Sequence, residues 1–465
     1  MTAPHPAHVE TLVIGAGLAG LSTALHLGPD ADVLIVDGLD HVGGKACTHR
    51  IGEFLFDVTG HWLHLRDPGI RETLLRLMGE DAFFKVDRIS RIWSHGVYTD
   101  YPFQANTFGL PPAVVHECLM GAITAAEARG GVDKKIAAED EPESFADWIR
   151  FYFGEGIARH FMIPYNARLW GVPATEITSR WCQRFVPKPN LSDIVAGGVG
   201  VNAQKMGYNA HFLYPRTGGI QSVSEALAAA IEGRAGGAAS ASVGRQPGGV
   251  SNSRIQLSTS VTALDLDARR ATLSDGRALT YRNLVNTSAL PKFINALSSP
   301  VPDDVRTANG RLRATSVTYF NVGVRGALGV PDHWVYVPEA NWPMYRVGSF
   351  SNAVPSMAPP GHSSLYIELS DRETPPEQLK GRVIEGLIAM GMLKSADQVL
   401  FMEARHVPLA YVIYDFHYHA SRARVHEWLN AQGAWSIGRY GDWNYSSMED
   451  ALMDGRALAQ RLQGA

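Results

Sequence analysis

The sequence predicts an α/β protein built on a discontinuous, doubly wound sheet, with an inserted helical domain and an antiparallel-sheet domain. Three observations indicate this fold class. A strand, a glycine-rich turn, a helix and a second strand follow one another within residues 11–37, which is how a doubly wound sheet begins. Residues 111–181 are rich in helical patterns, and most strand-like segments lie between residues 255 and 369. At 465 residues, the chain is also too long for one compact core.

The N-terminal unit consists of two strands with a helix between them. Thr11–Ile14 and Val33–Val36 are short apolar runs, as expected of buried strands. The helix between them is predicted from apolar residues at helical spacing, namely Leu18, Leu21, Ala24, Leu25 and Leu27. The inserted domain repeats this periodicity with Phe145, Trp148, Ile149, Tyr152 and Phe153.

Strands dominate the second half of the chain. We expect them at residues 255–257, 261–266, 271–273, 278–281, 316–324, 333–337 and 364–369. The third and fourth are joined by Ser-Asp-Gly, a hairpin turn signal. The tract at 232–253 is too rich in Gly, Ala and Ser to build a core, so we expect a flexible surface loop there. A helix over Met448–Leu462 closes the chain.

Composition excludes several classes of protein. The net charge is −4 and no Lys/Arg block is present, so nothing recruits nucleic acid or an anionic membrane. No apolar run is long enough to span a membrane and no signal peptide is evident, which makes the cytoplasm the expected location. The cysteines, Cys47, Cys118 and Cys182, fit neither a disulfide framework nor a metal cluster, and we expect them to be reduced and structural. We expect no metal site, because the histidines lack carboxylate or cysteine partners at ligand spacing.

The first functional motif is VIGAGLAG, with Gly15, Gly17 and Gly20. In a GxGxxG turn the first glycine permits the tight bend, the second lets a pyrophosphate approach, and the third lets helix and strand pack closely. Asp37 ends the next strand, where a carboxylate accepts hydrogen bonds from an adenosine ribose. Because a strand precedes the motif and a helix follows it, a dinucleotide-binding site explains these glycines better than a turn without a ligand.

A second glycine pair, Gly43 and Gly44 in HVGGKA, favours FAD over NAD as the dinucleotide. From this point the chain resembles the flavin amine oxidase and UDP-galactopyranose mutase superfamily, whose members have the same double glycine after the acidic residue. Lys45 stands where that superfamily commonly has an arginine.

Further motifs resemble the mutase branch, in the same order along nearly the whole chain. They are DVTGHW at 57–62, DRIS and DYPFQAN within 87–106, FMIPYNARLWGVP at 161–173, QRFVPKPNL, GYNAHFLYPRTGGIQ, WVYVPEANWPMYR at 334–346, AYVIYD and GRYGDWNY. The resemblance implies an FAD-binding domain formed by residues 1–110, 186–290 and 406–465. It implies a helical substrate domain at 111–185 and an antiparallel-sheet substrate domain at 291–405.

The resemblance also implies site residues. His61 would lie beside the flavin, and Arg184 and Arg346 would grip a nucleotide diphosphate. These three are the expected catalytic residues. The expected cofactor-binding residues are Gly15, Gly17, Gly20, Asp37, Gly43, Gly44, Lys45, His61, Arg439 and Met448. The expected substrate-binding residues are Arg88, Tyr101, Gln104, Phe161, Asn166, Trp170, Arg184, Asn209, Trp334, Tyr336, Arg346, Tyr411, Tyr414 and Tyr445.

The chemistry of these residues allows other interpretations. A guanidinium fork suits a diphosphate, but most arginines form ordinary ion pairs. Tyrosines can bind phosphate and pack on a uracil or sugar, or they can fill half-buried positions. Tryptophan and phenylalanine are more often core residues than contacts, and asparagine is a common turn residue.

The implied reaction is a pyranose–furanose isomerisation of a nucleoside diphosphate sugar, with N5 of reduced flavin as nucleophile and no net redox change. The main alternative is an FAD-dependent oxidation or desaturation of a small amine or alcohol, because fold does not determine chemistry. A non-catalytic flavin-binding protein is a third possibility, which would leave the polar cleft residues unexplained. The residues leave open the sugar, the nucleotide, the reductant and the oligomeric state.

Overall fold

The first sheet is the one the glycine motif predicts. In the computed structural model, which describes residues 7–131, 136–201, 211–233 and 252–464, its order is β10-β11-β12-β1-β2-β9. β1 (Ala7–Ile14) pairs in parallel with β12 (Ala278–Asn286) and β2 (Val33–Val36), and β9 (Arg254–Gln256) extends this parallel core. β18 (Ala434–Ser436) also joins β12 in parallel. The hairpin of β10 (Val261–Asp265) and β11 (Arg270–Leu273) continues the sheet in antiparallel fashion.

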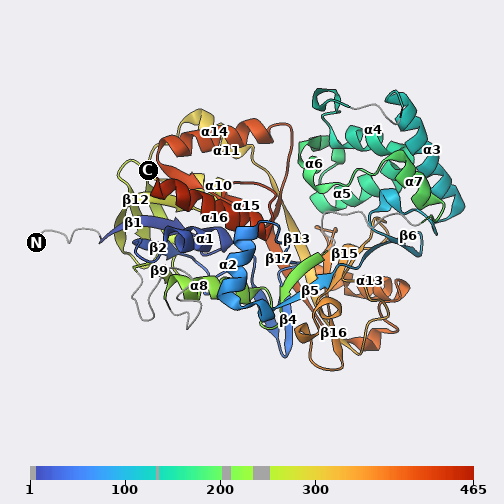
Figure 1. Ribbon diagram of the computed structural model, residues 1–465, viewed down its shortest axis with the longest axis horizontal. Coiled ribbons are helices and arrows are strands. Elements are labelled where there is room, and N and C mark those ends of the chain that lie inside the picture. Colours follow the sequence, from blue (N-terminus) through green and yellow to red (C-terminus); the bar gives the residue numbers. More distant parts are fainter. Residues whose placement is uncertain (1–6, 132–135, 202–210, 234–251, 465) are drawn as a thin grey trace, which may run out of the picture.

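Helices from both chain ends cover this sheet (Figure 1). α1 (Leu18–Leu27) packs against α16 (Met448–Gln463), so the last helix joins the first. Glycine makes the close approach possible, because a Cβ at Gly455 would lie 2.5 Å from the carbonyl oxygen of Ala19. The same domain holds α2 (Pro68–Met78), α8 (Gln221–Ile231), α10 (Leu290–Asn295), α11 (Asp303–Gly310), α14 (Tyr418–Ala431) and α15 (Gly438–Gly441).

The second sheet has the order β17-β13-β16-β15-β14-β6-β7. Its strands are β17 (Val399–Val412), β13 (Ala314–Arg325), β16 (His362–Leu369), β15 (Met344–Ser349), β14 (Trp334–Tyr336), β6 (Ser90–Ser94) and β7 (Val97–Asp100). α13 (Pro376–Ala389) packs beside β17. The sheet is mixed rather than purely antiparallel, since β14 and β6 pair in parallel.

The second sheet also departs from the expected boundaries. β6 and β7 come from the segment 1–110, because a sheet can recruit strands that are distant in sequence. α11 and nearly all of α10, in contrast, lie within 291–405, but α11 packs on α14 of the first domain and α10 packs on α11. β17 continues past residue 405 and leads the chain back to that domain (Figure 1).

The helical unit contains α3 (Pro112–Ala128), α4 (Phe145–Ile157), α5 (Ile163–Trp170), α6 (Cys182–Phe185) and α7 (Leu191–Gly198). A π-helical turn, Ala158–Met162, joins α4 to α5. α3 and α4 cross at glycines, since a Cβ at Gly154 would lie 2.0 Å from the carbonyl oxygen of Gly121. α7 packs on α3, so the helical unit extends beyond residue 185.

Smaller elements connect these parts. β3 (Thr48–Ile51) pairs with β4 (Phe54–Asp57), and β5 (Phe83–Asp87) pairs with β8 (His211–Pro215). α12 (Phe350–Ala353) follows β15. Most of the expected loop at 232–253 lies outside the described residues, because residues 234–251 are not described.

Three further findings concern the described residues alone. The three cysteines are buried and unpaired. The described helices include none long and apolar enough to cross a membrane. Across the described ranges, no cluster of three or more His, Cys, Asp or Glu side chains is arranged to hold a metal ion.

Candidate cofactor and substrate site

The glycine turn between β1 and α1 opens directly onto a large cavity. Gly15 has φ 109°, a left-handed conformation that favours glycine, and its Cβ would lie 2.2 Å from Oγ1 of Thr287. A Cβ at Gly20 would lie 2.1 Å from the carbonyl oxygen of Gly15, so Gly20 allows helix and strand to touch. At Gly17 the nearest protein atom to such a Cβ is 4.0 Å away. The space beside Gly17 is therefore left for a ligand at the N-terminus of α1.

Asp37 and the second glycine pair complete this end of the cavity. Asp37 Oδ2 accepts the N–H of Ala16 at 2.8 Å, and Oδ1 accepts the N–H of Leu39 at 2.9 Å. Each carboxylate oxygen keeps a lone pair for ribose hydroxyls. Gly43 and Gly44, with φ 103° and 60°, turn the chain back over the first glycine motif.

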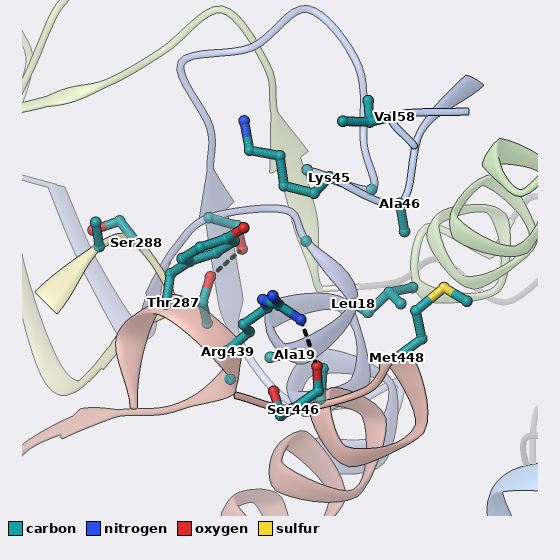
Figure 2. A pocket seen from close by; sticks show the side chains of 18 of the residues that line it. Leu18, Ala19, Lys45, Ala46, Val58, Thr287, Ser288, Arg439, Ser446 and Met448 are labelled. Carbon is teal, nitrogen blue, oxygen red and sulfur yellow. Dashed lines mark hydrogen bonds between the residues drawn. The ribbon is translucent and has the colours of Figure 1, made fainter. Parts of the chain in front are cut away.

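The cavity has a volume of about 700 Å³. It extends from Asp37 and Val261 past the glycine turn and His61 to Arg346 and Tyr411. Figure 2 shows Lys45, Thr287, Arg439 and Met448 around it. A long cavity with one end at a βαβ turn has the shape expected for a dinucleotide with a substrate space beyond it.

Four residues that line the cavity have a buried polar atom without a hydrogen-bond partner in the described residues. The atoms are His61 Nδ1, Trp62 Nε1, Trp334 Nε1 and Ser446 Oγ. Buried polar atoms normally find partners, so this wall fits a ligand that supplies them. Burial, aided by the charge of Arg439, lowers the pKa of His61 to about 4, and the imidazole is therefore neutral at neutral pH.

Arg439 and Met448 come from the C-terminal segment. Arg439 donates hydrogen bonds to the carbonyl oxygens of Ser446 and Ala410, both at 2.9 Å. Its guanidinium carbon lies 4.9 Å from the ring centre of Tyr445. Met448 begins α16 and lines the cavity beside Leu18 (Figure 2). The predicted cofactor residues thus line one cavity, except Gly20, which packs against Gly15 behind it.

Arg346 lies at the far end of the cavity on β15. Its Nε and Nη2 donate to the carboxylate of Glu368 on β16, and Nη2 also donates to the hydroxyl of Tyr411 at 2.8 Å. Tyr345 donates to the same carboxylate. Burial alone would lower the pKa of Arg346, but Glu368 together with Tyr411, Tyr345 and Tyr165 raises it well above its ordinary value, so the guanidinium stays charged. No hydrogen bond is recorded for Nη1 within the described residues, and Arg346 lines the cavity.

Aromatic side chains from three parts of the chain form the wall near Arg346. Trp334, Tyr411 and Tyr445 line the cavity itself. Behind Trp334, Arg88 donates to Tyr336 at 2.8 Å, and Tyr101 stacks on Tyr336 with ring centres 5.1 Å apart. Phe161 and Trp170 bring the helical unit into this wall, since Trp170 contacts both Tyr411 and Tyr445 and Phe161 contacts Tyr336.

The structure places the remaining expected substrate residues elsewhere. Gln104 donates to the carbonyl oxygen of Pro187 and Asn166 to that of Met162, and both are buried away from the cavity. Tyr414 donates to Asn444 and accepts from the N–H of Tyr445, so it supports the neighbouring loop. Asn209 and the side chain of Arg184 lie outside the described part of the structure.

Four charged residues that sequence reasoning missed belong to this region. Arg66, Lys292 and Glu449 line the cavity, and Glu368 holds Arg346. Glu449 follows the predicted Met448 and could have been suspected from its position. Lys292 and Arg66 stand in segments without a recognisable motif, so only the fold brings them here.

The fold and the cavity define a dinucleotide-binding protein with an open pocket beyond the cofactor. A family model for flavin-containing amine oxidoreductases matches residues 18–463. The chain therefore belongs to that family, it is a flavoenzyme, and the predicted cofactor FAD is confirmed.

The comparisons also bear on the branch of the family. A reduced UDP-galactopyranose mutase has a closely similar structure, with a TM-score of 0.87 and 22% identity over 98% of this chain and 96% of that one. A putrescine oxidase bound to putrescine is more distant, with a TM-score of 0.66 and 16% identity over 98% and 99% of the two chains. A dTDP-fucopyranose mutase from Escherichia coli is 24% identical over 192 residues, which is 40% of this chain and 48% of that protein. That match spans about half the length of the relative. The predicted mutase-like resemblance is confirmed at the level of the fold.

Lys292 provides a test of the cofactor site. Burial lowers the pKa of Lys45, the positive charge of Lys292 lowers it further, and both residues line the cavity. The diphosphate of FAD is the anion suited to lie near both. We expect Lys292→Ala to weaken FAD binding by up to about fivefold at low salt and less at high salt, because exposed charge pairs are modest and screened.

Release of FAD after dilution, followed by flavin fluorescence, measures this effect. Lys394→Ala is the matched control, because Lys394 is exposed and does not line the cavity. Lys292→Arg should restore binding. Equal release from the Lys292→Ala and Lys394→Ala variants would contradict a role for Lys292.

Proposed function

We propose that this flavoenzyme converts the pyranose form of a nucleoside diphosphate sugar into its furanose form, with FAD reduced and no net redox change. The observation that carries the proposal is the cavity end beyond His61, where Arg346 meets Trp334, Tyr411 and Tyr445. A guanidinium group suits a diphosphate, while phenol and indole rings pack on a base or sugar and donate hydrogen bonds. The fold of a UDP-galactopyranose mutase and the partial match to a dTDP-fucopyranose mutase support the same function.

The residues would divide the work as follows. Arg346 is held rigidly by Glu368 and Tyr411, so its Nη1 group can bind a phosphate oxygen without first being ordered. Arg184 is the proposed second phosphate ligand. Keeping the diphosphate close after it leaves the sugar allows it to return, which favours isomerisation over hydrolysis.

The cofactor and the wall have distinct tasks. Reduced flavin, when bound, supplies a nucleophilic nitrogen for the anomeric carbon of the sugar. Neutral His61 stands on the cavity wall without a charge that would compete for phosphate. Trp334 and Tyr445 narrow the space and exclude water from the reacting carbon.

Anaerobic incubation with nucleotide sugars tests the proposal. Dithionite-reduced enzyme should convert UDP-galactopyranose, dTDP-fucopyranose or a related nucleotide sugar into its furanose isomer without further use of reductant. Oxidised enzyme should be inactive. Oxygen uptake and hydrogen peroxide in proportion to product would reject the proposal in favour of an oxidase.

A further inference from the structure

A second cavity lies between the helical unit and the second sheet. Its volume is about 640 Å³, which is within the usual range for small-molecule sites. α4 and α5 contribute one side, and the segments after β16 and along α13 contribute the other. Figure 1 shows α5 beside β15 and α13 at this junction. None of the residues assigned to the FAD and substrate cavity lines it.

Arg168 on α5 is the buried cation of this cavity. Its Nε and Nη2 donate to Ser370 Oγ, and Nη1 and Nη2 donate to the carbonyl oxygens of residues 337, 339, 342 and 344. Burial lowers its pKa to about 10, although Glu339 offsets part of the effect. All of its hydrogen-bond acceptors are neutral, and Arg168 forms no ion pair with another described residue.

Arg372 and Arg382 add two more cations. Arg372 donates to the carbonyl oxygens of Ser370, Arg168 and Leu169, and burial lowers its pKa. Arg382 donates to the carbonyl oxygen of Asn341. Within the described ranges, no salt bridge is recorded for either residue, and each guanidinium has N–H groups beyond those used. The side chains of Arg372 and Arg382 are exposed and line the cavity, so these N–H groups are open to an anion that enters it.

The other charged groups of the cavity offset these arginines only in part. Asp371 also lines the cavity; its Oδ1 accepts the N–H groups of Glu373 and Thr374, and its carboxylate offsets one of the three positive charges. Arg150 already pairs with Asp147 and Glu155. The rest of the wall is largely apolar, with Ile163, Val172 and Leu379.

We propose that this second cavity binds a phosphate-bearing ligand, with the phosphate held by Arg372 and Arg382. Arg168 contributes positive charge from beneath. The apolar wall would receive an organic portion of the ligand, so a phosphate ester should bind more tightly than free phosphate. Because both lobes of the cavity contribute, binding should also hold the helical unit against the second sheet and raise the melting temperature.

Calorimetric titration of the FAD-loaded protein tests this proposal, with inorganic phosphate and phenyl phosphate as probes at constant ionic strength. Arg382→Gln should weaken both probes about tenfold or more, because a charge-assisted phosphate contact is lost. Arg325→Gln is the matched control, since Arg325 is exposed at the end of β13 and does not line the cavity. Tighter binding of phenyl phosphate indicates an ester as the natural ligand, and equal binding indicates free phosphate.

Two outcomes would overturn the proposal. One is the absence of binding heat for either probe at millimolar concentration. The other is binding that Arg346→Lys removes and Arg382→Gln leaves unchanged, because the anion would then lie in the substrate cavity. The test requires no enzymatic activity, so failure of the proposed isomerase function would not affect its result.

Discussion

Replacing Gly17 by valine is expected to give a folded protein without flavin. A Cβ at this position has no protein atom nearer than 4.0 Å, so the fold can accept a side chain. The same side chain would occupy the space in which the FAD pyrophosphate reaches the N-terminal N–H groups of α1. The purified variant should be colourless, while the unchanged protein should show an oxidised flavin spectrum. Absorbance measures the flavin, and far-UV circular dichroism measures the fold.

Two glycine variants separate loss of cofactor from loss of structure. Gly381→Val should remain yellow, because Gly381 lies on α13 with no atom within 4 Å of a new Cβ. Gly15→Ala should disturb the fold itself, since its Cβ would lie 2.2 Å from Thr287 and its φ is 109°. A Gly17→Val protein with full flavin content would show that the pyrophosphate lies elsewhere.

The glycine motif could be predicted from the sequence because all its parts are local. Gly15, Gly17, Gly20 and Asp37 lie within one βαβ unit, whose spacing determines their positions. The boundaries of β2 could be predicted for the same reason. Its four residues are a continuous apolar run, and all four are buried.

The partner of Arg346 could not be predicted in this way. Glu368 lies on the neighbouring strand β16, and the antiparallel register of β15 and β16 places it directly opposite Arg346. In the sequence, Glu368 stands between the apolar residues Ile367 and Leu369. Such a pattern is typical of a solvent-facing position on a half-buried strand. The structure buries it completely, because both faces of this strand are covered. At this buried position Glu368 forms a long-range ion pair with Arg346.

The tyrosines show a similar limit. Tyr411 and Tyr414 lie three residues apart in one motif, yet the former lines the cavity and the latter supports a loop through Asn444. β17 ends at Val412, so the regular alternation of side chains ends between them. Both are tyrosines of the same motif, and the end of the strand between them distinguishes their roles.

Arg346→Ala is expected to weaken UDP binding, but the structure predicts a cost in stability as well. Removing the guanidinium leaves Glu368 buried without its partner, and breaking a buried pair typically costs about 3–5 kcal/mol. Loss of affinity in this variant alone would therefore not identify a phosphate contact. The pair must be changed together.

The double variant Arg346→Met with Glu368→Gln removes both charges and keeps similar side-chain volumes, so most of the stability should return. UDP binding should still fall by about tenfold to over a hundredfold, because a charge-assisted phosphate contact contributes roughly 1.5–3 kcal/mol. Glu368→Gln alone is the matched control, since it retains the cation at the cavity wall. Calorimetric titration with UDP measures affinity, and the flavin spectrum shows that the cofactor site is intact. If the double variant binds UDP as tightly as the control, Arg346 does not bind the diphosphate, and the proposed substrate class loses its main support even with FAD in place.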